Sequence, residues 1–147
     1  LIENENSIYF SNNIGDFYSI DVNTGTINWT QKINSNVKPA IINNLIFTIS
    51  LDGFLFLIEK NTGNIIRISN LSYESKFKKI NSINPVGFVL NSKNLFVSTS
   101  NGTLLIVNIG TGKITEVLKL DKDKISRGFV HNQNMYLIRD NSIIKIN

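Results

Sequence analysis

The sequence predicts an all-β fold built from repeated antiparallel modules, and three observations support this. A glycine is followed ten residues later by the glycine of a Thr-Gly pair at three places: Gly15 to Thr24-Gly25, Gly53 to Thr62-Gly63 and Gly102 to Thr111-Gly112. Apolar runs rich in β-branched and aromatic residues flank these glycines, as is typical of strands. No segment longer than a turn or two shows the 3, 4 and 7 spacing of an amphipathic helix.

The second copy defines the module most clearly. An apolar run opened by Pro39 leads to a turn at Asn43-Asn44, because proline belongs at the start of a strand and asparagine favours turns. Asp52-Gly53 reads as a two-residue hairpin turn, and Thr62-Gly63 marks the next turn. The predicted strands are therefore residues 39–42, 45–50, 54–59 and 65–68.

The other copies follow the same scheme. Asn101-Gly102 is the predicted hairpin turn of the third copy, and Asn141 replaces the glycine in the fourth, since asparagine tolerates a left-handed backbone. The first copy is expected to lack its opening strand and the last copy its closing strand. The whole chain should then hold fourteen strands.

Four-stranded modules that recur about every 40 residues are the signature of a β-propeller. We therefore expect one partial domain over residues 1–147, an arc of about three and a half to four blades cut from a seven- or eight-bladed ring. The approximate blades are residues 1–34, 35–70, 83–120 and 125–147. Open edges invite pairing with another chain, so a dimer with 28 strands in seven blades is a further hypothesis.

Composition limits the chemistry. The chain has no cysteine, which excludes disulfides, thiolate nucleophiles and cysteine metal sites. Because it opens without methionine, it is expected to be a processed or excised piece. The net charge of +4 divides into −3 for residues 1–60 and +7 for the rest. Codon drift in an A/T-rich genome explains this lysine-rich half better than a selected anion-binding surface, although both readings remain open.

The segment from Ser19 to Trp29 resembles the tryptophan-docking motif of quinoprotein (PQQ-type) propeller repeats, Ala-x-Asp-x-x-Thr-Gly-x-x-x-Trp. The second copy has Glu59 and Arg67, and the third Asn108 and Glu116, at the positions of the motif's Asp and Trp. The resemblance implies structural roles, in which the Trp packs between blades and the Asp and Gly shape the turn. The repeat residues so assigned are Asp21, Thr24, Gly25, Trp29, Gly53, Thr62, Gly63, Gly102, Thr111 and Gly112.

Two branches share this repeat. One comprises the quinoprotein alcohol and glucose dehydrogenases, which hold pyrroloquinoline quinone, a Ca²⁺ ion and an Asp base. The other comprises the BamB-like lipoproteins of outer-membrane assembly, which are scaffolds that contact a central barrel protein. Loss of the Trp from two copies makes the chain more similar to the second branch. The resemblance then implies a non-catalytic protein-binding scaffold without a cofactor, in the periplasm or on the periplasmic face of the outer membrane. The alternative is the C-terminal part of a quinoprotein dehydrogenase.

A search for catalytic groups supports the scaffold. The single histidine, His131, lies beside a predicted turn, and no phosphate-binding glycine motif is present. We therefore predict no catalytic, cofactor-binding or metal site. The insertion from Ser69 to Ser82 interleaves aromatic residues with lysines and is expected to form a surface loop. Its aromatic residues could pack back on the blade, contact a protein partner or stack on nucleic acid. Nucleic-acid binding is the least favoured of these three alternatives. The candidate partner residues are Tyr73, Lys76, Phe77 and Lys78.

Overall fold

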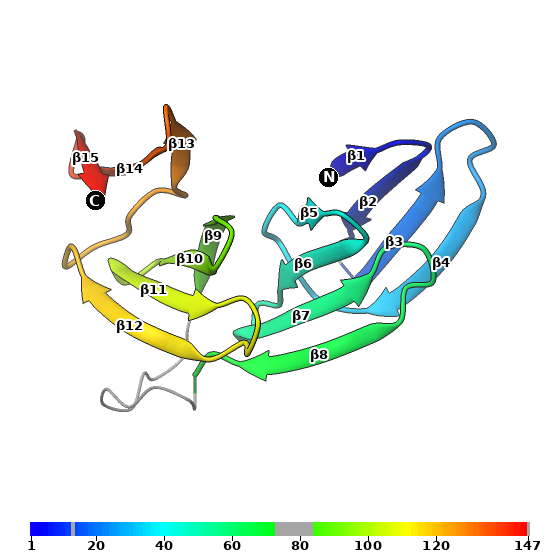
Figure 1. Ribbon diagram of the computed structural model, residues 1–147, viewed down its shortest axis with the longest axis horizontal. Helices are drawn as coiled ribbons and strands as arrows, with labels where there is room; N and C mark the ends of the chain where they lie inside the picture. Colours follow the sequence, from blue (N-terminus) through cyan, green and yellow to red (C-terminus); the bar gives the residue numbers. More distant parts are fainter. Residues whose placement is uncertain (13, 73–83, 147) are drawn as a thin grey trace. The chain divides into compact units, whose positions relative to one another are not determined.

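The computed structural model describes residues 1–12, 14–72 and 84–146, which form strands and turns with no helix among them (Figure 1). The all-β fold class is confirmed. The strands are β1 Ile2–Asn4, β2 Ser7–Ser11, β3 Asp16–Asp21, β4 Ile27–Lys32, β5 Ala40–Ile42, β6 Leu45–Ile49, β7 Phe54–Glu59, β8 Ile65–Asn70, β9 Pro85–Leu90, β10 Asn94–Thr99, β11 Thr103–Asn108, β12 Ile114–Lys119, β13 Phe129–His131, β14 Asn134–Arg139 and β15 Ser142–Ile146.

The strands form four separate sheets, and in each sheet neighbouring strands follow one another in the sequence. Three sheets have four strands, β1 to β4, β5 to β8 and β9 to β12, and the last has three, β13 to β15. Figure 1 shows each sheet as a meander, with the chain running back and forth before it moves to the next sheet. This is the blade arrangement that the repeated turns predicted.

The chain divides into two compact units, residues 1–69 and 70–147. The first unit buries a cluster between its two sheets, formed by Tyr9, Phe17, Trp29, Ile33, Ile46 and Ile58. The second buries Leu104, Ile125, Met135 and Leu137. The predicted single domain and the four blade boundaries stay predictions.

One strand was missed in the sequence. The first copy was expected to lack its opening strand, but β1 pairs with β2 in the register Ile2↔Tyr9 and Asn4↔Ser7. The polar residues Glu3 and Asn4 hid it, because an edge strand is held by backbone hydrogen bonds and needs only one apolar contact, here from Ile2. The described residues therefore hold fifteen strands rather than fourteen, and two copies no longer total the 28 strands of the seven-bladed dimer.

The hairpin turns at Gly53 and Gly102 are longer than predicted. Ser50 N–H donates to Phe54 O and Gly53 N–H donates to Ser50 O, so three residues rather than two form the loop. Gly53 has a φ of 81°, the left-handed residue that ends a three-residue hairpin loop. At the equivalent position the fourth copy has a two-residue turn, between the paired residues Arg139 and Ser142. There Asp140 and Asn141 have φ of 44° and 58°, which confirms the left-handed asparagine.

The insertion begins later than predicted. Strand β8 extends through Ser69 to Asn70, and Leu71 is fully buried, so these residues are not part of a surface loop. The sequence alone concealed this because serine and asparagine are weak strand formers, whereas the β8 backbone simply continues the meander. The candidate partner residues Tyr73, Lys76, Phe77 and Lys78 lie outside the described residues.

Candidate functional site

The Thr-Gly turn of each four-stranded sheet is braced by a polar side chain three residues before the threonine. In the first sheet, Asp21 Oδ1 accepts hydrogen bonds from the N–H groups of Asn23 and Thr24, at 2.9 and 2.8 Å, and from the Thr24 hydroxyl at 3.0 Å. The Thr24 bonds are the main reason that the pKa of Asp21 lies below its ordinary value. Gly25 N–H closes the turn on Asp21 O.

The other two Thr-Gly turns are braced in the same way by different side chains. In the third sheet Asn108 Oδ1 accepts from Thr111 N–H at 2.9 Å and from the Thr111 hydroxyl at 3.1 Å. In the second sheet the Thr62 hydroxyl donates to Glu59 Oε2. Aspartate, glutamate and asparagine all supply a side-chain oxygen here, so the three positions vary in the sequence while the turn persists.

Trp29, the only tryptophan in the chain, docks the first sheet onto the second. It lies on β4, is 9% exposed, and its Nε1–H donates to Lys60 O at 2.9 Å. Its ring covers Gly63, because a methyl group added at Gly63 would lie 2.5 Å from Trp29 Cδ2. Gly63 also has a φ of 74°, so both space and backbone conformation require glycine there.

Neighbouring side chains complete this dock. Phe17 stacks near the indole, with ring centroids 5.9 Å apart, and Tyr9 lies at the same distance on another side. Lys60 Nζ donates to Asn4 Oδ1 and Glu5 Oε2, each at 3.0 Å. The indole is therefore enclosed by aromatic rings, a glycine turn and a lysine that joins the two sheets.

Only Trp29 fills the motif's last position with an aromatic residue. Trp29 pairs with Ser19 of the neighbouring strand, and Glu116 pairs with Ile106 at the matching place in the third sheet. Trp29 is buried, whereas Glu116 is exposed. Within the described residues, the complete dock of tryptophan, glycine and carbonyl acceptor therefore occurs once.

A second repeated device was missed in the sequence. At each three-residue hairpin, the residue before the loop accepts a hydrogen bond from the N–H of the residue after it. The pairs are Asn12 with Asp16 at 2.9 Å, Ser50 with Phe54 at 3.1 Å and Thr99 with Thr103 at 3.0 Å. When the copies are aligned on Gly15, Gly53 and Gly102, a polar residue stands three positions before each glycine. The shared role is hard to recognise in the sequence because the residue is Asn, Ser or Thr in different copies.

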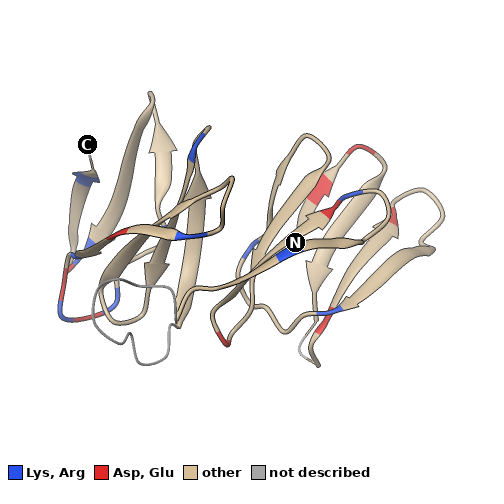
Figure 2. Ribbon diagram, turned by 60° about the horizontal axis from the view of Figure 1, so that its bottom comes forward, with Lys and Arg blue, Asp and Glu red and all other residues tan. Residues whose placement is uncertain are grey.

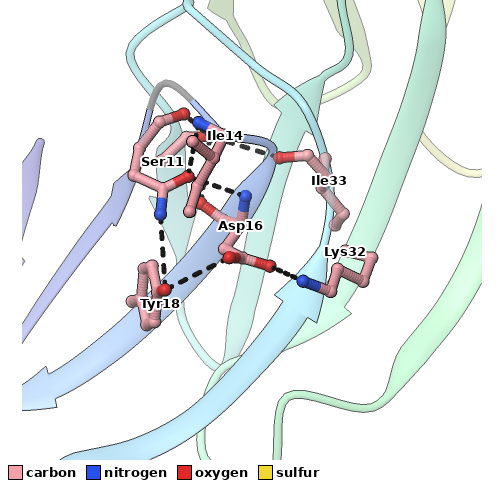
Figure 3. A network of polar contacts seen from close by, with 7 residues as sticks. Ser11, Ile14, Asp16, Tyr18, Lys32 and Ile33 are labelled. Atoms are coloured by element: carbon pink, nitrogen blue, oxygen red, sulfur yellow. Dashed lines mark hydrogen bonds and ion pairs between the residues drawn. The ribbon is translucent and has the colours of Figure 1, made fainter.

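A polar network surrounds Asp16 at the start of β3, and Figure 3 shows Tyr18 and Lys32 pointing toward its carboxylate. Lys32 Nζ lies 2.5 Å from Asp16 Oδ1, and the Tyr18 hydroxyl donates to Oδ2 at 3.3 Å. The Asp16 side chain is 8% exposed and that of Lys32 is 86% exposed. The hydrogen bond and charge of Lys32 outweigh burial and hold the pKa of Asp16 below its ordinary value.

This network makes a pH-dependent contribution to stability. A carboxylate with a lowered folded-state pKa stabilises the fold above its unfolded pKa and loses that effect as the pH falls through the folded pKa. Asp16→Asn should therefore be less stable than the parent at pH 7, and the difference should shrink as the pH falls below the ordinary Asp pKa of about 3.9. Urea titrations of both proteins from pH 7 to pH 2 measure it, and a difference that stays constant over this range would contradict the assignment.

The acidic residues, red in Figure 2, are spread over strand ends and turns rather than gathered in one place. Among the described residues, no group of three His, Cys, Asp or Glu side chains is close enough to hold a metal ion. His131 ends β13 and is exposed, next to the left-handed turn residues Asn132 and Gln133. The polar geometry of the described residues thus consists of turn braces and sheet contacts.

The family comparison agrees with this geometry. Residues 1–69, which hold the complete tryptophan dock, match the family model described as outer membrane protein assembly factor BamB. Residues 1–69 are similar to the PQQ-like repeats of BamB, and the β-propeller fold of the chain resembles that of BamB. No curated protein sequence matches this chain.

Solved structures share the fold of this chain. BamB from Moraxella catarrhalis matches with a TM-score of 0.62 and 16% identity, over 99% of this chain and 56% of that one. Two computationally designed proteins match at 12% identity over 98% of this chain: Ika4, with a TM-score of 0.76 over 86% of its length, and Ika8, with 0.74 over 43%. The chain thus spans about half of the BamB structure. No helix in the described part of the chain could cross a membrane.

Proposed function

We propose that this protein is a non-catalytic scaffold that binds a protein partner in outer-membrane assembly. The observation that carries the proposal is an apolar strip on β8, an edge strand of the second sheet. Ile66 and Ile68, two residues apart on one face of β8, are 55% and 53% exposed. An edge strand that presents apolar side chains suits the addition of a partner's strand.

The family match supports the same role. The matched family is described as an outer membrane protein assembly factor, and the matched residues include β8 up to Ser69. We infer that the partner is the central barrel protein of the assembly machinery and that the scaffold acts in the periplasm or on the periplasmic face of the outer membrane. Fractionation of cells that express the native gene tests the compartment, and a cytoplasmic pool alone would overturn that part.

A paired substitution tests the surface. Ile66→Lys with Ile68→Lys should weaken binding to the soluble periplasmic domain of the organism's own barrel protein by at least about tenfold, because two apolar contacts are lost. Calorimetric titration measures the affinity. Ile27→Lys is the matched control, since Ile27 is 58% exposed on β4, the edge strand of the other sheet.

Two results would count against the scaffold. The parent chain could fail to bind the barrel domain, or the β8 variant could bind as tightly as the control. Titration with pyrroloquinoline quinone examines the dehydrogenase alternative directly. Saturable one-to-one binding of the quinone would favour the enzyme, and no binding is expected from the scaffold.

A further inference from the structure

The second unit contains a cavity of about 550 Å³ between the sheet of β9 to β12 and the sheet of β13 to β15. Its apolar lining residues are Val89, Leu90, Phe96, Val130, Met135 and Ile146. Asn91, Ser92 and Gln133, which lie in or beside turns, add polar groups. A volume of this size is typical of pockets that take small organic groups.

One wall matches the surroundings of Trp29 by strand register. In the first unit, Ile2 pairs with Tyr9, and the row continues through Ser19 to Trp29. In the second unit, Val89 pairs with Phe96, and the row continues through Ile106 to Glu116. Val89 and Phe96 thus hold the places of Ile2 and Tyr9, and Glu116 holds the place of Trp29.

The opposite wall matches as well. In the first unit, Ile46 pairs with Ile41 on one side and Ile58 on the other. In the second unit, Met135 pairs in the same way with Val130 and Ile146. Ile46 and Ile58 belong to the buried cluster around Trp29, and Ile41 packs against it. Five of the six apolar lining residues, all except Leu90, are therefore register equivalents of residues that belong to the Trp29 cluster or pack against it.

The rim also corresponds to the first unit. Asn91 and Ser92 follow Val89 by two and three residues, as Asn4 and Glu5 follow Ile2. In the first unit Lys60 Nζ bridges to Asn4 and Glu5, and its backbone O accepts from the indole. In the second unit Asn91 and Ser92 line the cavity, and the residue at the register position of Trp29 is the exposed Glu116.

We propose that this cavity binds the side chain of a tryptophan presented by a protein partner, an inference that rests on the proposed scaffold function. The first unit supplies the precedent, because the equivalent positions there belong to, or pack against, the buried cluster that contains Trp29. Phe96 and Met135 offer ring and sulfur contacts that favour an aromatic plate. The Ser92 hydroxyl and the Gln133 amide at the rim can accept the indole N–H, as Lys60 O does for Trp29.

Amino-acid amides test the cavity without a partner. N-acetyl-tryptophanamide should bind the full chain saturably, with a dissociation constant of about millimolar order as a single side chain allows. The Met135 methyl signal, observed by ¹H–¹³C NMR, should shift on binding. N-acetyl-leucinamide should bind at least about fivefold more weakly, because it lacks the aromatic plate.

Variants locate the binding site. Glu116→Trp should fill the cavity from within and abolish binding of the tryptophan amide, whereas the matched control Glu116→Gln should bind as the parent does. Val130→Lys provides a second variant in case Glu116→Trp does not fold. Val130 is 55% exposed on the short strand β13, and a charge at that wall should weaken binding at least about threefold.

Several results would overturn the proposal. These are no saturable shift of Met135, equal affinity for both amides, or unchanged binding to a folded Glu116→Trp. Sedimentation velocity tests a further outcome. If the parent chain is a dimer and Glu116→Trp converts it to a monomer, the cavity binds a second copy of this chain instead of a partner's tryptophan. The amide titrations require no barrel protein. Binding of the tryptophan amide can therefore be observed even if the proposed assembly role is wrong, and the assembly role can be correct even if the amide does not bind.

Discussion

Replacing Trp29 by alanine is expected to lower the free energy of unfolding of the first unit by about 3–5 kcal/mol. The indole is 9% exposed, contacts Tyr9 and Phe17, and donates to Lys60 O. Its removal leaves a cavity between two sheets and an unpaired carbonyl, and both effects destabilise the fold. Urea titration followed by far-UV circular dichroism measures the change, since the variant has no tryptophan left to report fluorescence.

Glu116→Ala is the matched control for this substitution. Glu116 occupies the equivalent register position but is exposed, so its removal should change stability by no more than about 0.5 kcal/mol. A Trp29→Ala cost below about 1 kcal/mol, or a cost equal to that of the control, would contradict the docking role.

Gly63→Ala is expected to destabilise the fold by about 1–3 kcal/mol more than Gly25→Ala does. The two glycines have almost the same left-handed backbone, with φ of 74° and 71°, so the strain of adding a side chain is shared. They differ in their surroundings. A methyl group at Gly63 would lie 2.5 Å from the Trp29 ring, whereas a methyl group at Gly25 would meet nothing within 4 Å.

The comparison of these two glycines separates backbone strain from crowding. The same urea titration gives both values, and the Gly25 variant serves as the internal reference. Equal costs would show that only the turn conformation matters and that Trp29 does not bear on Gly63. A further check is Gly63→Ala in the Trp29→Ala background, where the added cost should fall toward that of Gly25→Ala.

Much of the fold could be predicted because glycine and asparagine residues mark its turns in the sequence. Gly25, Gly63 and Asn141 mark left-handed positions that few other residues adopt, so they fix the strand boundaries. Strand β1 escaped prediction because an edge strand is held by its backbone, and the side chains of Glu3 and Asn4 carry no apolar pattern. The three-residue hairpins were misread because glycine ends both kinds of loop and only the strand pairing distinguishes them.

The candidate site was less accessible to sequence reasoning. The resemblance to PQQ-type repeats pointed to Trp29 as a packing residue, but its partners Lys60 and Gly63 come from the next sheet. The cavity of the second unit is lined by residues of five strands, β9, β10, β13, β14 and β15, and no spacing in the sequence indicates that they meet. In the sequence, Glu116 at the position of the motif's tryptophan indicates only that the motif is incomplete there.

The central claim, that a single indole locks the first two sheets together, is tested most directly by the indole N–H signal of Trp29 in ¹H–¹⁵N NMR. The chain has one tryptophan, so one such signal is present. A buried N–H that donates to Lys60 O at 2.9 Å should exchange with deuterium far more slowly than in a free peptide, and Gly63→Ala should remove that protection. An indole N–H that exchanges as fast in the native chain as in urea would contradict the dock.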